Sequence, residues 1–366
     1  MMNIEEYLNK MVDIQNALLA WIEAESNEEI LSLHFFELLD KLKIKENPNE
    51  LRLVLHLSSK ISLNHHRKPN FFENFDKIIT FFKDDISKYF SNSEIFRIFE
   101  DNRRILIFLI NSKILVVDEY VSTKLKQKSK NLNRTFHLYS RRNQAENFDK
   151  YFSPELNPNS SNEDENFYKN RLIAENESYL CQLIRNDSVE EFIIYVNKNI
   201  INLSMQIYSS IFEVNFNFNE CKSLIGYAAF FGSIQIFRYL MQNGVALTQS
   251  LWIDAIHGKN AELIHLLEEN KVLPYYSYNE CYEEAIKCHH NDIAKYILNN
   301  YMQNENQYDF LPLYLKYYNL EFIKPDQINE KVLNDLIDFD YILFAEKIVR
   351  LPNVNVNLMK NKIQIL

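Results

Sequence analysis

The sequence is unusually poor in glycine, with only four among its 366 residues, against an average usage of about 7%. This scarcity argues against Gly-rich phosphate loops, dinucleotide-binding turns and tight β-hairpins, all of which need positive backbone angles. It favours helices, in which glycine is costly. The four cysteines are scattered through a long chain, so we expect reduced core thiols rather than a disulfide framework.

A long apolar run is also missing, since no stretch of about 20 apolar residues occurs. The first residues, MMNIEEYLNK, lack the basic and then apolar pattern of a signal peptide. We therefore expect a cytoplasmic protein with neither a signal peptide nor a membrane span. Apolar residues make up 46% of the chain, enough to bury a core. The net charge of −10 does not suit nucleic-acid binding over the whole surface.

Residues 1–118 carry apolar side chains at helical spacing, beginning with Ile4, Leu8 and Met11. Ser26 and Ser91 are each followed three residues later by Glu, the pattern of a capping box that starts a helix. No strand-like alternation competes with these signals. We predict a helical N-terminal domain built from antiparallel neighbours.

Residues 119–166 differ in composition and predict a basic connector that ends in a polar and acidic loop. Phe136 and Tyr139 lie within the basic stretch, and interleaved basic and aromatic residues can bind a nucleic-acid backbone and stack on bases. Anion or nucleic-acid binding through 124–142 is therefore the alternative function. A solvated connector is favoured, because the rest of the chain is acidic. The candidate anion-binding residues are Lys124, Lys126, Lys128, Lys130, Arg134, Arg141 and Arg142.

Residues 167–366 contain a repeated pattern: AAFFGSIQIFRYLMQNGV from Ala228, AIHGKNAELIHLLEENKV from Ala255 and AIKCHHNDIAKYILNNYM from Ala285. Each copy predicts a short helix around a small residue and a second, amphipathic helix. One such unit cannot bury its apolar face alone, so stacking must complete the core. The expected repeat core is Ala228, Ile236, Leu240, Ala255, Leu263, Leu267, Ala285, Ile293 and Ile297.

The second helix of each copy ends at an asparagine: Asn243, Asn270 and Asn300. Asparagine tolerates the left-handed conformation that closes many helices. These three residues are therefore candidates for it, and Gly244, directly behind Asn243, suits it better still.

The first copy resembles an ankyrin repeat, in which a small pair and a Gly precede a leucine-rich second helix. The ending LPNVNVN is also ankyrin-like. More specifically, a set of four segments is similar to a trichomonad family of ankyrin-repeat proteins with a poorly characterised helical region and divergent repeats: LIRNDSVEEFIIYVNKN, AAFFGSIQIFRYL, SLWIDAIHGKNAELIHLLEENKV and CHHNDIAKYI. The resemblance implies an ankyrin-like α-solenoid that recognises other proteins without catalysis. The usual Thr-Pro-Leu-His opening is lost, and the units are shorter than 33 residues, so we expect irregular stacking.

Cysteine and histidine gather near the third copy, where Cys281, Cys288, His289 and His290 lie close in sequence. The two cysteines are seven residues apart, whereas zinc sites usually contain a tighter pair. We therefore expect no metal site. His289 and His290 are expected in a turn between helices.

A second histidine pair, His65 and His66, precedes Pro69 and is expected in a solvated loop. No Gly-x-Ser-x-Gly or phosphate-binding motif occurs. We therefore predict no catalytic residue and no cofactor.

The link VLPYYSYNE offers three tyrosines, Tyr275, Tyr276 and Tyr278, as candidate partner-binding residues, because tyrosine is common in interfaces. Packing of these rings on a neighbouring unit is the competing interpretation, and the sequence does not decide between the two. The prediction is an all-α protein: a helical N-terminal domain followed by a solenoid. It acts as a non-catalytic scaffold or adaptor for another protein, of unknown identity; nucleic acid is not the expected partner.

Overall fold

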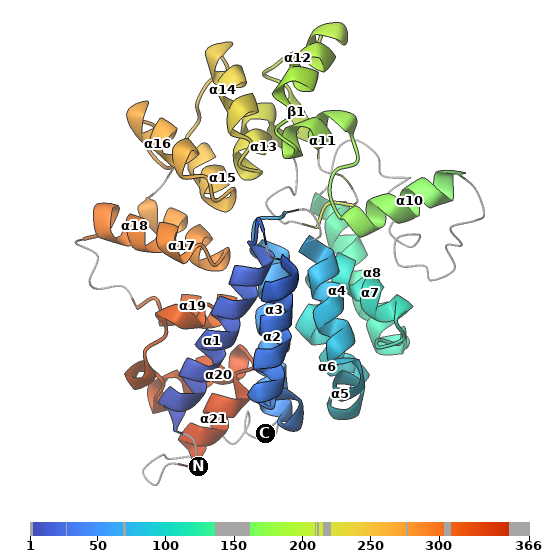
Figure 1. Cartoon of the computed structure of the whole chain (residues 1–366), viewed down its shortest axis with the longest axis vertical. Coiled ribbons are helices and arrows are strands. Elements are labelled where there is room, and N and C mark those ends of the chain that lie inside the picture. Colours follow the sequence, from blue (N-terminus) through green and yellow to red (C-terminus); the bar gives the residue numbers. More distant parts are fainter. Residues whose placement is uncertain are drawn as a thin grey trace. The chain divides into compact units, whose positions relative to one another are not determined.

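Helices account for most of the chain in the computed structural model (Figure 1), which confirms the predicted all-α class. The only sheet among the described residues has two strands of three residues each. The structure describes residues 3–26, 28–68, 71–135, 162–208, 210, 212–214, 221–275, 277–303 and 309–350.

The described residues up to 118 are mostly helical, as expected. Asn3 and Ser91 each form a complete capping box with a glutamate three residues on. Up to residue 135 the helices are α1 (Ile4–Ile22), α2 (Glu28–Lys41), η1 (Ile44–Glu46), α3 (Pro48–Asn64), α4 (Phe71–Phe81), α5 (Lys83–Tyr89), α6 (Asn92–Phe99), α7 (Arg103–Asn111) and α8 (Glu119–Thr135).

The elements after residue 161 begin with a helix and then form helix pairs, interrupted once by the two strands. In chain order they are α10 (Asn162–Ile173), α11 (Tyr179–Arg185), α12 (Val189–Lys198), β1 (Gln206–Tyr208), β2 (Cys221–Ser223), α13 (Leu224–Phe230), α14 (Ile234–Gln242), α15 (Leu251–His257), α16 (Ala261–Glu269), α17 (Tyr278–Lys287), α18 (Asn291–Tyr301), α19 (Leu311–Tyr317), η3 (Leu320–Phe322), η4 (Pro325–Gln327), η5 (Glu330–Val332), α20 (Leu333–Asp338) and α21 (Ile342–Val349).

The chain folds into two compact units that are not continuous in sequence. The first contains Met1–Ser62, Lys68–Asn74 and Gln303–Leu366, and the second contains Leu63–Arg67 and Phe75–Met302. These units differ from the three consecutive stretches expected from the sequence. Each unit contains residues from before 118 and residues from after 166, because helices distant in sequence pack together.

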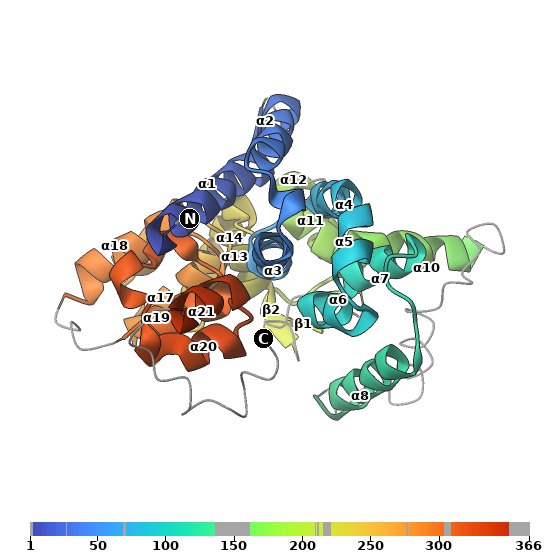
Figure 2. The same cartoon turned by 90° about the horizontal axis from the view of Figure 1, so that it is seen from below.

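The first unit contains helices from both ends of the described chain. The buried amide of Gln15 in α1 donates to Asn319 Oδ1 at 3.2 Å and accepts from the Leu320 amide at 2.8 Å. Lys10 and Glu50, both buried, form an ion pair at 2.6 Å. α19, α20 and α21 lie side by side in both Figure 1 and Figure 2. These polar contacts fix the register of α1 against its neighbours.

The second unit contains four consecutive helix hairpins: α11/α12, α13/α14, α15/α16 and α17/α18. The first helices of successive hairpins contact one another, from α11 to α13, α15 and α17, and the hairpins fan out along the chain in Figure 1. All nine residues expected in the repeat core are buried, none more than 7% exposed. Trp252, in the first helix of the third hairpin, is also buried.

A repeated hydrogen bond joins each hairpin to the one before it. Ser233, Asn260 and His290 occupy the same position, directly before the second helix of their hairpins. Each side chain donates to a backbone carbonyl of the preceding hairpin: Ser233 to Ile184, Asn260 to Gly232 and His290 to Ile256. Equivalent positions therefore make equivalent contacts, although the residue types differ.

The ends of the second helices correct one prediction. Asn243 and Asn270 have φ angles of −90° and −83°, so they are not left-handed. The left-handed residues are instead the ones that follow, Gly244 and Lys271. The asparagine amides instead donate to the carbonyl four residues earlier, at 2.8 Å and 2.7 Å, as does that of Asn300 at 2.8 Å. The asparagine thus satisfies a last-turn carbonyl that would otherwise lack a partner within the helix.

Candidate functional site

The tyrosine link between α16 and α17 is only partly exposed. Tyr275 is 64% exposed, whereas Tyr276 lies outside the described residues. Tyr278 begins α17, and its ring stacks on Tyr301 at 4.0 Å and meets Trp252 edge-on at 5.4 Å. The structure therefore places Tyr275 on the surface and Tyr278 in an aromatic cluster.

Two of the links that connect one hairpin to the next carry exposed apolar side chains. Ile200 is 92% exposed in the link after α12, and Leu273 is 63% exposed in the link after α16. We use the term link surface for Ile200, Met205, Tyr208, Leu273 and Tyr275. The side chains of α13, α15 and α17 are by contrast largely buried, whereas α11 and α12 expose Tyr179 and Ile194.

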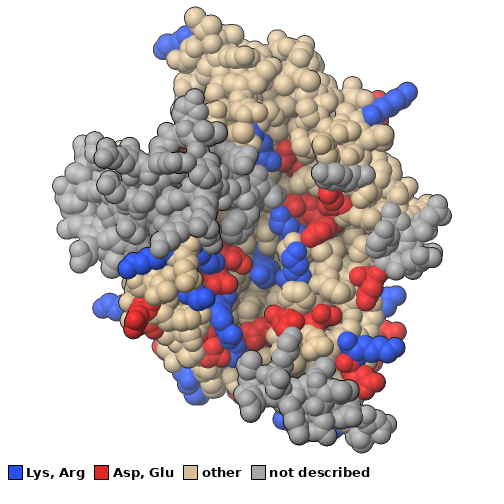
Figure 3. All heavy atoms as spheres, turned by 180° about the vertical axis from the view of Figure 1, so that it is seen from behind, with Lys and Arg blue, Asp and Glu red and all other residues tan. Residues whose placement is uncertain are grey.

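The basic segment begins in α8 and continues beyond it. Lys128 contacts Glu100 and Asp101, donating to the Glu100 carbonyl at 2.7 Å and pairing with the Asp101 carboxylate at 3.2 Å. Lys124 lies over the Tyr120 ring at 5.8 Å, and Lys126 is exposed. The side chains of Lys130 and Arg134, together with all of Arg141 and Arg142, lie outside the described part. On the face shown in Figure 3, the basic and acidic side chains of described residues are interspersed.

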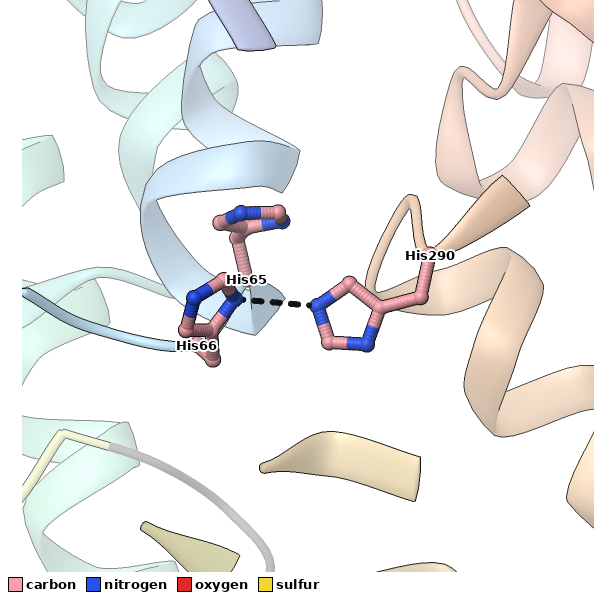
Figure 4. Close-up of side chains that lie close together, drawn as sticks. All are labelled: His65, His66 and His290. Carbon is pink, nitrogen blue, oxygen red and sulfur yellow. Dashed lines mark hydrogen bonds between the residues drawn. The ribbon is translucent and has the colours of Figure 1, made fainter. Parts of the chain in front are cut away.

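Three histidines from distant parts of the sequence meet in the second unit: His65, His66 and His290 (Figure 4). One potential ligand atom from each lies within 4.8 Å of the other two, and His66 Nδ1 is 3.1 Å from His290 Nε2. His65 is 1% exposed and His290 is fully buried. The expectation of a solvated loop was therefore wrong for His65, which follows the last turn of α3 and is covered by the turn before α18.

Backbone carbonyls set the protonation of two of these rings. His65 Nδ1 lies 2.6 Å from the Cys288 carbonyl oxygen, and His290 Nδ1 lies 2.8 Å from that of Ile256. A carbonyl oxygen only accepts, so Nδ1 carries the hydrogen in both rings. In the neutral form, Nε2 of each ring is then the nitrogen without a hydrogen. Burial, with His65 and His66 nearby, holds the pKa of His290 well below its usual value, so its ring is neutral at physiological pH.

A second cluster lies beside the first and consists of His257, Glu284 and Cys288. His257 Nδ1 is 3.2 Å from Glu284 Oε1 and 3.3 Å from Cys288 Sγ, and Lys287 pairs with Glu284 at 3.0 Å. Burial lowers the pKa of His257 to about 4 and raises that of the Cys288 thiol. Burial also raises the pKa of Glu284, but Lys287 and His257 outweigh it and hold that pKa well below its usual value. A thiol with a raised pKa is a poor nucleophile, so this cluster does not have the character of a cysteine active site.

A small cavity adjoins both clusters. Its volume of about 10 Å³ corresponds to about one water molecule. His66, Arg67, Glu175 and His257 supply its polar lining. The guanidinium of Arg67 donates to Glu175, and both side chains are largely buried.

Glu213 lies near this ion pair and is itself buried. Burial, reinforced by the negative charge of Glu175, raises the pKa of Glu213 to about 8. Its Oε2 accepts a long hydrogen bond of 3.4 Å from the Ser210 amide, and its Oε1 has no hydrogen-bond partner among the described residues. Glu213 is therefore protonated in the folded protein at neutral pH.

The sequence contained one signal for the histidine cluster. In the repeat alignment, His290 falls where the other copies have Ser233 and Asn260. All three make the contact with the preceding hairpin, but only an imidazole has a second nitrogen that can act elsewhere. Nothing in the sequence indicated that His65 and His66 would meet it, because they lie more than 220 residues away.

Comparisons with known proteins give this chain no relative: no protein-family model, no curated protein and no solved structure matches it. Among the described residues, no helix is both long enough and apolar enough to cross a membrane.

Proposed function

We propose that the protein is a non-catalytic scaffold or adaptor that binds another protein through an ankyrin-like α-solenoid formed by α11–α18. The observation that carries this proposal is the link surface: five large apolar side chains exposed at the connections between hairpins. Exposed apolar groups of this kind mark protein interaction sites more often than catalytic ones. The links connect helices that are packed against one another within the hairpins. The links are therefore restricted before a partner binds, and little conformational entropy would be lost on binding.

The repeated contacts support the solenoid interpretation. Side chains at one repeat position bond to the preceding hairpin three times in succession. Such nearest-neighbour contacts are what repeat proteins use to stack. Binding to phosphate through α8 receives less support, because Lys128 is already engaged by Glu100 and Asp101.

The test is affinity capture from the native lysate at low and high salt, with the full chain as bait. The full chain is required because the second unit contains residues from both the N-terminal and the repeat regions. The test bait carries Leu273→Ser and Tyr275→Ser. The control bait carries Ile30→Ser and Leu33→Ser, two substitutions of exposed apolar residues on α2 in the other unit.

We expect the wild type and the control to retain the same protein at high salt, and the test bait to lose most of it. Removing two interface anchors typically costs at least about 2 kcal/mol, or roughly 30-fold in affinity. Equal retention by all three baits would contradict the role of the link after α16. Retention that disappears at high salt or after nuclease treatment would favour the basic segment instead.

A further inference from the structure

The histidine cluster has the composition and spacing of a metal site. We propose that His65, His66 and His290 together bind one divalent transition metal ion, with Zn²⁺ as the best fit. This site is separate from protein binding through the link surface and does not depend on it.

The distances suit zinc coordination with little movement. Zinc–nitrogen bonds are about 2.0–2.1 Å long, so two ligands of a tetrahedral zinc lie about 3.3 Å apart. His66 Nδ1 and His290 Nε2 are already 3.1 Å apart, and all three ligand atoms lie within 4.8 Å of one another. Side-chain rotation that brings the remaining ligand atom closer would complete the set.

The hydrogen bonds of the rings resemble those of metal-binding histidines. Such a histidine usually donates its other ring N–H to a carbonyl or carboxylate, which fixes both its tautomer and its orientation. His65 and His290 each donate Nδ1–H to a backbone carbonyl, Cys288 and Ile256 respectively. This arrangement leaves Nε2 of each ring as the nitrogen that would bind the ion. His66 would bind through Nδ1, and the hydrogen that Nδ1 now shares with His290 would move to Nε2 of the same ring.

The donor set selects the class of ion. Three imidazoles suit zinc, copper and nickel, whereas magnesium and calcium prefer oxygen ligands. Three protein ligands leave a coordination position for water, and the cavity of about 10 Å³ lined by His66 provides room for one.

The neighbouring cluster of His257, Glu284 and Cys288 is the weaker candidate. Its groups already bond to one another, and Glu284 is also neutralised by Lys287. A metal there would have to displace these contacts and deprotonate a buried thiol. At the three histidines a metal would displace only the hydrogen bond between His66 and His290, and no thiol would have to lose its proton.

The experiment measures Zn²⁺ binding to the purified, chelator-treated full chain by competition with a chromophoric chelator, and records the visible spectrum with Co²⁺. The first variant is His290→Asn, because asparagine at the equivalent position 260 keeps the carbonyl hydrogen bond and lacks the second nitrogen. His66→Asn is the second variant, since its ring is only half-buried and folding should tolerate the change. His34→Asn, an exposed histidine on α2, is the matched control.

We expect one Zn²⁺ per chain for the wild type and for His34→Asn, and a loss of about 100-fold or more in affinity for each cluster variant. That estimate takes as a lower bound the 10–100-fold effect of altering residues behind the ligands. Circular dichroism establishes that each variant is folded. Absence of stoichiometric binding by the wild type would overturn the proposal, as would equal affinity in His290→Asn and His66→Asn. A thiolate-to-cobalt charge-transfer band would overturn it as well, because it would assign the metal to Cys288.

Discussion

Substituting Glu213 by glutamine should make the second unit more stable in alkaline solution. The folded carboxyl titrates at about 8, against 4.5 in the unfolded chain. Between these values the folded state holds a proton that the unfolded state has lost. The contribution of Glu213 to the free energy of unfolding must therefore fall as pH rises from 4.5 to 8 and level off above 8. At about 1.4 kcal/mol per pH unit, this difference is worth about 5 kcal/mol, a large share of typical domain stability.

Glutamine has nearly the same shape and cannot ionise, so the Glu213→Gln variant should lack this slope. We expect the two proteins to be nearly equal in stability at pH 4.5 and the variant to be several kcal/mol more stable at pH 9. The assay is urea unfolding followed by tryptophan fluorescence in a Trp21→Phe background. Trp252, which lies in the same unit as Glu213, is then the only tryptophan.

The control for this comparison is Glu190→Gln, which removes an exposed carboxylate from α12 in the same unit. It should follow the wild-type pH dependence. Parallel curves for wild type and Glu213→Gln from pH 5 to 9 would refute the reasoning, because Glu213 would then be ionised and solvated in the folded protein.

Two further substitutions test packing and ion pairing. Asp340→Asn should cost the first unit about 2 kcal/mol at pH 7, measured by urea unfolding. Burial raises the pKa of Asp340, but His56 and Arg52 outweigh burial and hold that pKa at about 2. The stability that the carboxylate contributes is therefore present above pH 3.8 and lost as pH falls through 2. Gly258→Ala should lower the stability of the second unit by about 1–3 kcal/mol, seen as a lower melting temperature, because its Cβ would lie 2.3 Å from the Ala229 carbonyl oxygen.

Each of these substitutions has an informative contrary result. If Asp340→Asn loses the same stability at pH 2 as at pH 7, its cost arises from packing and not from charge. Gly244→Ala is the control for Gly258→Ala: no atom lies within 4 Å of its Cβ, and only its positive φ of 82° opposes the change. A larger cost at Gly244 than at Gly258 would contradict the close contact between hairpins.

Local features of the fold followed from the sequence where a short-range pattern determines them. The capping box at Ser91 and the burial of Ala228 and its equivalents are examples, because helix starts and apolar faces depend on residues a few positions apart. The role of Asn243 was mistaken for the same reason. Both a left-handed cap and a side-chain bond to the last turn suit asparagine, and only the backbone angle distinguishes them.

The candidate site depended on contacts that no local pattern encodes. His65 was expected in solvent because it follows a helix and precedes Pro69, yet the turn at Cys288 covers it. The two units are likewise discontinuous in sequence. Residues 63–67 belong to the second unit, whereas the segments on either side of them belong to the first. Long-range packing decided both outcomes. The position of Tyr278 in an aromatic cluster with Tyr301 also depended on the next helix.

The most direct test of the scaffold proposal is hydrogen–deuterium exchange on the full chain, alone and in complex with the protein it captures. The account predicts slower exchange on binding in peptides that cover 199–208 and 271–278, where the link surface lies, and unchanged exchange in α2. Protection confined to α8, or to α2 and its neighbours in the first unit, would contradict recognition through the links.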